Sequence, residues 1–130
     1  MPTGMNYGLG NSITYWTMHN LTPSTGAVWD DTTVMLTHLY QVQPLGNVTC
    51  TNVAAGGKIA DMPTDCVPNL VAFILAHGRG YLPGQTAADE ADHVLTLWVD
   101  INGEMHVSEG FTGVIYLAHS QYQICEKVYR

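Results

Sequence analysis

Residues 97–107 decide the fold, and they read Leu-Trp-Val-Asp-Ile-Asn-Gly-Glu-Met-His-Val. Apolar and polar side chains alternate on both sides of Asn102 and Gly103, as they do in strands that pack one face on a core. Asn-Gly is the pair preferred in a two-residue type I′ turn, because both residues tolerate positive φ. We therefore predict an antiparallel hairpin whose two-residue turn is Asn102-Gly103.

The same period of two recurs along the chain and predicts an all-β fold. We expect an antiparallel β-sandwich or flattened β-barrel of about seven or eight strands, with at most one short helix. Besides the hairpin, the predicted strands are 13–20, 32–43, 47–53, 113–118 and 121–128, the last two forming a second hairpin.

Residues 70–93 contain an apolar run, a glycine-rich segment and an acidic segment. The continuously apolar run 70–76 is predicted to be a strand in the central core, with Phe73 fully buried. The glycine-rich residues 77–84 are predicted to form a loop. The acidic residues 87–93 are expected to form one or two helical turns at most.

Composition limits the partners that this chain can have. Its 130 residues suit a single β domain, preceded by a loose arm over residues 1–11. The net charge is −7 with only four Lys and Arg residues, so the surface repels nucleic acids and anionic lipids. We expect no nucleic-acid partner, no membrane association and no cofactor. If the protein is exported, the sequence is expected to begin near a mature N-terminus.

The three cysteines fit no metal-binding spacing. One interpretation is that all three are reduced and buried as small apolar residues. The other is one disulfide. We rank Cys50–Cys66 first, because it closes a loop of only about 15 residues and would stabilise by roughly 3 kcal/mol. Cys125 would then be a buried free thiol, and a bridge from Cys125 to either partner is the alternative.

Two clusters of polar residues are candidate chemical sites. Asp89, Glu90, Asp92 and His93 offer carboxylates and an imidazole to a divalent cation, although the simpler interpretation is a solvated acidic turn that caps the following strand. His77 and Arg79 could cleave a phosphodiester together with a carboxylate, by general acid–base catalysis and charge stabilisation. No sequence motif supplies an activated nucleophile.

Three further sets of residues are candidates for binding or modification. His19, His38 and His106 fall within predicted strands and could meet at a metal on one face. Trp29 and Tyr81 are aromatic residues in predicted loops and are our candidate binding residues. Asn20-Leu-Thr and Asn47-Val-Thr are glycosylation sequons, so Asn20 and Asn47 are candidate acceptors.

Parts of residues 13–70 resemble a family of small secreted fungal β-barrel proteins, typified by the Alternaria major allergen and related elicitors. The resemblance lies in Tyr-Trp-Thr-Met-His-Asn-Leu-Thr at 15–22, Asp-Asp-Thr-Thr at 30–33, Val-Thr-Cys-Thr at 48–51, and Cys66. Val34 stands where that family usually has a further cysteine. The resemblance implies a secreted, non-enzymatic protein that binds host plant proteins or small ligands, sometimes as a homodimer.

We therefore favour a secreted fungal effector-like protein that binds a host protein or small ligand without chemistry. Two alternatives come from other functional classes. One is a small secreted ribonuclease-like hydrolase that uses His77 and Arg79. The other is a self-assembling structural or capsid-like subunit. A hydrolase should bring a histidine, an arginine and a carboxylate together in a concave site.

Overall fold

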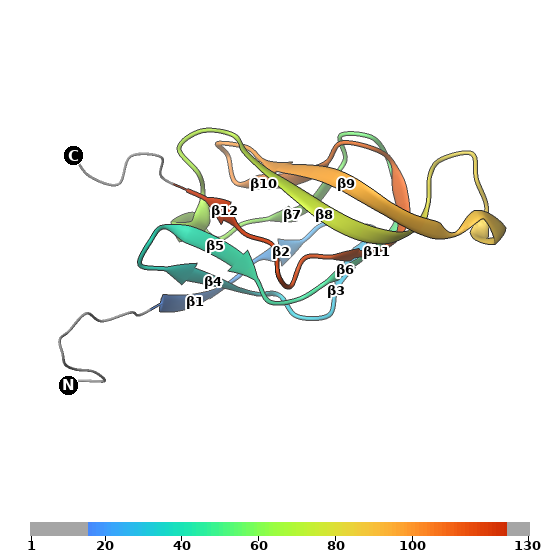
Figure 1. The fold of residues 1–130 in the computed structure, drawn as a ribbon. Helices are drawn as coiled ribbons and strands as arrows, with labels where there is room; N and C mark the ends of the chain where they lie inside the picture. Colours follow the sequence, from blue (N-terminus) through green and yellow to red (C-terminus); the bar gives the residue numbers. More distant parts are fainter. Residues whose placement is uncertain (1–15, 125–130) are drawn as a thin grey trace.

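The computed structural model describes residues 16–124 and confirms the all-β fold, with two antiparallel sheets (Figure 1). The small sheet has the order β1 (Trp16–Asn20), β4 (Thr33–Thr37), β5 (Gln41–Pro44) and β12 (Tyr122–Gln123). The large sheet has the order β2 (Thr22–Pro23), β7 (Lys58–Asp61), β10 (Glu104–Val107), β9 (Ala91–Val99), β8 (Ala72–Tyr81), β11 (Phe111–Tyr116), β6 (Val48–Val53) and β3 (Ala27–Trp29). Two short 3₁₀ turns are η1 (Thr64–Cys66) and η2 (Ala87–Asp89).

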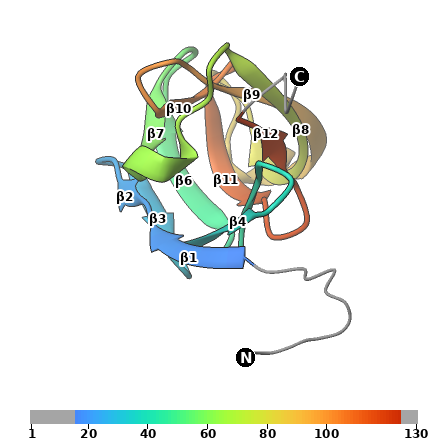
Figure 2. The same cartoon turned by 90° about the vertical axis from the view of Figure 1, so that its left-hand side faces the viewer.

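The large sheet curves until it is nearly a closed barrel, which is visible when it is seen end-on (Figure 2). Its two edge strands, β2 and β3, follow each other in the chain and lie close together. The side chains that point inward form one apolar core. Its largest fully buried members are Phe111, Ile59, Leu95, Leu97, Met105, Ile115 and Leu117.

The predicted hairpin over residues 97–107 is confirmed, but its turn differs from the prediction. The N–H of Gly103 donates to the carbonyl of Asp100 at 2.9 Å, so Ile101 and Asn102 are the central turn residues. Only Gly103 has positive φ, at 87°. The loop is therefore a three-residue type I turn with a glycine bulge. One oxygen of the Asp100 carboxylate also accepts from the N–H groups of Asn102 and Glu104, which stabilises this longer loop.

We expect Gly103→Val to reduce the free energy of unfolding by roughly 1 kcal/mol or more, measured by urea denaturation. A β-branched residue resists the positive φ, and a Cβ here would also lie 2.9 Å from Val67 Cγ2. Asn102→Ala is the matched control and should cost less than about 0.5 kcal/mol, because Asn102 is exposed and needs no positive φ. A large loss from Asn102→Ala would instead indicate the type I′ turn.

The prediction that residues 70–76 are wholly buried is wrong, and so is the loop predicted for residues 77–84. Both segments contribute to one ten-residue strand, β8, in which burial alternates. Ile74 and Ala76 point inward, whereas Phe73 is 68 % exposed and points outward. Because the side chains on both faces of this strand are apolar, its composition does not show that burial alternates.

Two positions in β8, Gly78 and Gly80, are glycine because a larger side chain would not fit there. A Cβ at Gly78 would lie 2.8 Å from Leu95 Cδ1. A Cβ at Gly80 would overlap the carbonyl oxygen of Thr112 on the neighbouring strand. These glycines mark close packing inside a strand and not the flexible loop that their composition suggested.

Two other strand predictions also need correction. Residues 32–43 are not one strand: the chain turns at residues 38–40, where Tyr40 has φ 62°, and forms the hairpin β4–β5. The predicted C-terminal hairpin does not form, because β11 pairs with β6 and β8 while β12 pairs with β5 of the small sheet. Twelve strands are described, more than predicted, because several are only two to four residues long.

Several expectations concern residues outside the described part of the chain. These are the arm over residues 1–11, the start of the first predicted strand at residues 13–15, and Cys125. Within residues 16–124, no helix has the length and apolar character needed to span a bilayer.

Candidate functional site

The outward side of β8, β9 and β11 carries a group of large apolar side chains that point away from the core. We call this group the aromatic face, and its members are Phe73, Leu75, Val94, Trp98 and Tyr116. The exposed fractions are 68 % for Phe73, 70 % for Leu75, 74 % for Val94 and 42 % for Tyr116, and Trp98 is half-buried.

Strand register makes the aromatic face contiguous. Phe73 lies directly opposite Trp98 in the β8–β9 pair, and Leu75 is two residues further along the same side of β8. On the other edge of β8, Tyr116 lies opposite His77 and stacks on its ring, with centroids 5.2 Å apart. Directly opposed side chains are within contact distance. The exposed apolar surface is on the order of 400 Å², the size of patch that often marks a binding site.

Charged groups stand at the end of the aromatic face that is nearest η2. The Arg79 guanidinium pairs with Glu90 at 3.0 Å and with Asp92 at 3.1 Å. His77 Nε2 lies 3.1 Å from the same Asp92 oxygen. The hydrogen bond from Arg79, with a further one from His77, holds the pKa of the Asp92 carboxyl below its usual value.

The structure thus brings together the histidine, arginine and carboxylate that a hydrolase would need. However, the arrangement is open to solvent, since the side chains of His77, Arg79 and Asp92 are 47 % to 61 % exposed. The two carboxylates also neutralise the Arg79 charge that would have to stabilise a transition state. The cluster is therefore better suited to bordering an interface than to catalysis.

The predicted metal cluster at residues 89–93 does not converge. The Asp89 carboxylate accepts from the N–H of Thr86 and caps η2. Glu90 and Asp92 are the partners of Arg79. His93 lies edge-on to Phe111, with ring centroids 5.9 Å apart.

The two candidate binding aromatics have different positions from those predicted. Trp29 is not exposed on a loop: it lies in β3, is 7 % exposed, and its indole N–H donates to the carbonyl of Ile59 at 3.1 Å. Tyr81 ends β8 and is half-buried. It lines a hollow of about 300 Å³ together with Leu82, Pro83 and Thr112.

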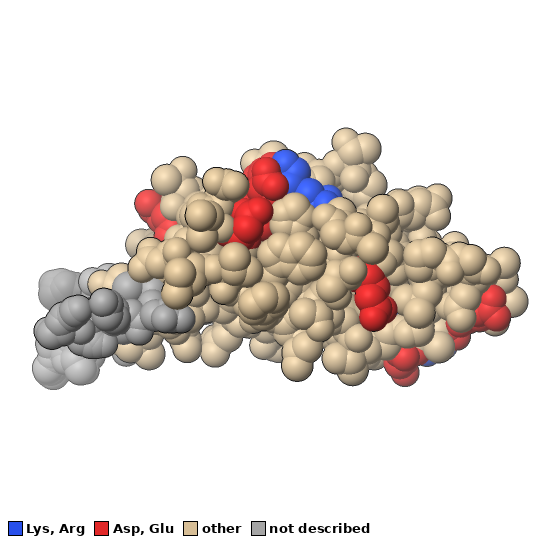
Figure 3. Space-filling view, turned by 90° about the horizontal axis from the view of Figure 1, so that it is seen from above, with Lys and Arg blue, Asp and Glu red and all other residues tan. Residues whose placement is uncertain are grey.

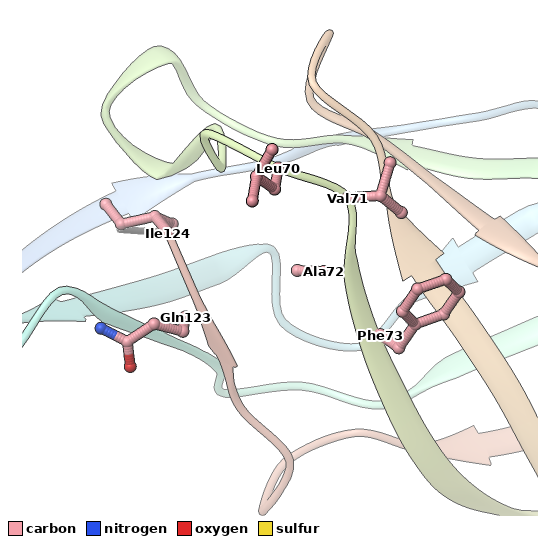
Figure 4. Close-up of a pocket in the computed structure, with 6 residues that line it drawn as sticks. All are labelled: Leu70, Val71, Ala72, Phe73, Gln123 and Ile124. Carbon is pink, nitrogen blue, oxygen red and sulfur yellow. The ribbon is translucent and has the colours of Figure 1, made fainter. Parts of the chain in front are cut away.

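A smaller hollow of about 170 Å³ adjoins the aromatic face where β8 begins (Figure 4). Leu70, Val71 and Phe73 line one side of it, and Gln123 and Ile124 line the other. The N–H of Asn69 donates to the carbonyl of Ile124 at 2.9 Å and holds the two sides together.

The predicted Cys50–Cys66 disulfide is absent. Both cysteines are free thiols that are buried in the core. Cys50 lies in β6, near one edge of the large sheet. The chain then crosses to the opposite edge, where β7 pairs with β10, so Cys66 is not reached by a short local loop. Burial raises the pKa of each thiol to about 11. The alternative interpretation, buried reduced thiols, applies to these two cysteines.

The two sequon asparagines differ in accessibility. Asn20 is exposed at the end of β1, and its side-chain oxygen accepts from the Thr32 hydroxyl. Asn47 is half-buried, and its side-chain oxygen accepts from the N–H groups of Leu117 and Ala118. Asn20 is therefore the better placed acceptor, since Asn47 organises the segment after β11.

The strand histidines do not form the three-histidine site either. His19 is near Asp65, with 3.8 Å between His19 Nδ1 and a carboxylate oxygen. His38 lies in the turn after β4. His106 Nε2 is close to the Asp100 and Glu104 carboxylates, at 3.2 and 3.3 Å.

No protein-family model, curated protein or solved structure matches this chain. The likeness to the fungal family therefore stays a hypothesis that rests on the short motifs within residues 13–70.

Proposed function

We propose that this protein is a binding protein that acts without chemistry and docks a partner protein through the aromatic face. The observation that carries the proposal is the contiguity of Phe73, Leu75, Val94, Trp98 and Tyr116 across three paired strands. Aromatic side chains on a rigid sheet supply large contact area with little loss of side-chain entropy, and they dominate interface energetics.

The charges around the aromatic face indicate the chemistry of the partner. Glu90 and Asp92 stand at one end, and Asp61, Asp100 and Glu104 stand beside β10 at the other. The cations among them, Arg79 and Lys58, are already paired with these acids. Figure 3 shows one side of the molecule, where uncharged residues cover most of the surface and acidic residues appear at several places. We infer a partner with an apolar centre and a rim of Lys and Arg.

The secreted, effector-like setting is part of this proposal and is supported by the resemblance within residues 13–70. The exposed sequon at Asn20 is compatible with it. The free thiols of Cys50 and Cys66 give it no support, because they form no stabilising bridge. The nature of the docking surface does not depend on this setting.

The test is capture on immobilised wild-type protein and on Phe73→Ser, followed by titration of each purified candidate that only the wild type retains. Phe73→Ser should weaken a specific partner at least about 30-fold, as expected for a hot-spot aromatic residue. Val28→Thr is the matched control, since Val28 is 70 % exposed but lies on the distant edge strand β3. Affinity should also fall as salt is raised.

The other functional classes predict different results in the same experiments. If Phe73→Ser and Val28→Thr bind the purified partner equally well, the proposal is wrong. Wild-type dimers or larger assemblies on a sizing column that Phe73→Ser dissolves would place a second copy on the face and favour the self-assembling subunit. RNA cleavage that His77→Gln abolishes would favour the hydrolase.

A further inference from the structure

Beside the hairpin turn, three side chains with metal-binding groups meet outside the aromatic face. Asp100 follows β9, and Glu104 and His106 lie two residues apart on the same side of β10. One donor atom from each lies within 4.8 Å of the others. The side chains of His106 and Asp100 are only 15 % and 23 % exposed, and that of Glu104 is 37 % exposed. This arrangement depends on the three-residue turn, because a shorter turn would change the register of β10.

The His106 ring is fixed by two contacts that leave Nε2 directed at the carboxylates. Nδ1 lies 3.0 Å from the carbonyl oxygen of Gly56, and a carbonyl can only accept, so Nδ1 carries the proton. Trp98 stacks on the ring with centroids 5.2 Å apart and planes at 18°. A histidine that donates one ring N–H to a backbone carbonyl and presents the other nitrogen is the usual arrangement of a metal ligand.

His106 Nε2 faces two carboxylate oxygens and has at most one proton to donate to them. Nε2 lies 3.2 Å from Asp100 Oδ2 and 3.3 Å from Glu104 Oε1. A protonated Nε2 has one N–H for two carboxylates, and both distances exceed the 2.7–2.9 Å or so of charge-assisted hydrogen bonds. A neutral ring would direct a lone pair at two anionic oxygens. In either state, at least one of the two facing oxygens, Asp100 Oδ2 or Glu104 Oε1, receives no hydrogen bond from Nε2.

A metal ion would bind all three groups, and His106 Nε2 already lies at ligand-like separations from the two carboxylate oxygens, which are within 4.8 Å of each other. Ligands at about 2.0–2.1 Å from a tetrahedral ion lie roughly 3.3–3.4 Å apart. Asp100 Oδ1 is occupied by the N–H groups of Asn102 and Glu104, which leaves Oδ2 for an ion.

We propose that Asp100, Glu104 and His106 bind one divalent transition-metal ion of the Zn²⁺ or Mn²⁺ class. One imidazole nitrogen and two carboxylate oxygens form a mixed donor set that suits these ions better than all-oxygen Ca²⁺ or all-sulfur sites. Lys58 lies 3.9 Å from the other Glu104 oxygen, Oε2, and is held by Asp61 at 3.0 Å, so it leaves Oε1 available. The ion would tie the β9–β10 turn to the loop at Gly56 through His106.

The test is calorimetric titration of chelator-treated protein with Zn²⁺ and with Mn²⁺, together with NMR of the Mn²⁺-loaded protein. We expect one ion per chain, and Mn²⁺ should broaden the His106 and Trp98 ring signals before those of His77. Glu104→Gln and His106→Gln should each weaken binding at least about tenfold. His77→Gln is the matched control, because His77 faces a single carboxylate oxygen of Asp92, and it should leave affinity unchanged.

Three outcomes would overturn the proposal. The first is no binding of either ion at about 1 mM, a concentration that corresponds to roughly −4 kcal/mol of binding free energy. The second is an affinity for the ion that is unchanged in Glu104→Gln. The third is Mn²⁺ broadening that is centred on the His77 ring signals. Mn²⁺ is included because it prefers oxygen and nitrogen donors, so its binding cannot be attributed to the cysteine thiols. If His106→Gln does not fold, Glu104→Gln decides the question, since the Glu104 side chain is 37 % exposed and its contacts with Lys58 and His106 are ion pairs.

Discussion

Phe111→Ala should reduce the free energy of unfolding by about 3–5 kcal/mol, measured by urea denaturation. Phe111 is 1 % exposed and is among the largest fully buried side chains. Its ring lies under β8, where a Cβ at Gly78 would come within 3.1 Å of it, and it packs on the edge of His93. Removing the ring would leave a cavity that these close-packed strands cannot fill.

Phe73→Ala is the matched control, because the chain has two phenylalanines and they lie on opposite sides of the same sheet. Phe73 is 68 % exposed, so its truncation should cost less than about 1 kcal/mol. If both variants lose the same free energy of unfolding, Phe73 is buried and the aromatic face does not exist as described. The pair therefore tests the direction in which β8 faces as well as the strength of the core.

Alternation of side chains was enough to predict the fold class, because an antiparallel strand with one face on a core imposes a period of two. It was not enough where both sides of a strand are apolar. Residues 70–76 indicated a buried strand, yet Phe73 and Leu75 face outward while Ile74 faces inward. A strand with an exposed apolar face has the same composition as one buried on both sides, so sequence alone did not separate them.

Local residue preferences also failed where tertiary contacts decided the backbone. Tyr40 adopts positive φ in the β4–β5 turn without the glycine or asparagine that usually signals one. Trp29 falls in a predicted loop, but it lies in β3 and its indole N–H donates to the carbonyl of Ile59, 30 residues away. Neither the turn at Tyr40 nor the hydrogen-bond partner of Trp29 could be identified before the strand pairing was known.

The candidate sites required strand register, which the sequence does not specify. The sequence does not identify the carboxylates that pair with His77 and Arg79, because Asp92 lies in β9 and Glu90 just before it. Those acids had been assigned to a separate metal cluster. Tyr116 reaches the aromatic face only because β11 pairs with β8. The available signal was that residues 70–76 and 94–99 carry apolar side chains on both faces of their strands.

Gly80→Ala should destabilise the protein by about 3 kcal/mol, near the upper end of the cost of inserting a group into a packed interior. Gly80 faces Gly113 across the β8–β11 pair, and a Cβ would overlap the Thr112 carbonyl oxygen and lie 2.8 Å from Gly113 Cα. The obstacle is backbone, which cannot rotate away as a side chain can. The strands would have to separate next to the bulge between Phe111 and Gly113.

Gly84→Ala separates this steric effect from the ordinary cost of replacing glycine. Gly84 has φ 88° with open space around it, so alanine there should cost only about 1–2 kcal/mol of backbone strain. Gly80 has no positive φ, so its larger loss must come from overlap with β11. Urea midpoints for the two variants give the comparison. A loss at Gly80 no larger than at Gly84 would mean that β8 and β11 are not packed closely enough for glycine to be required.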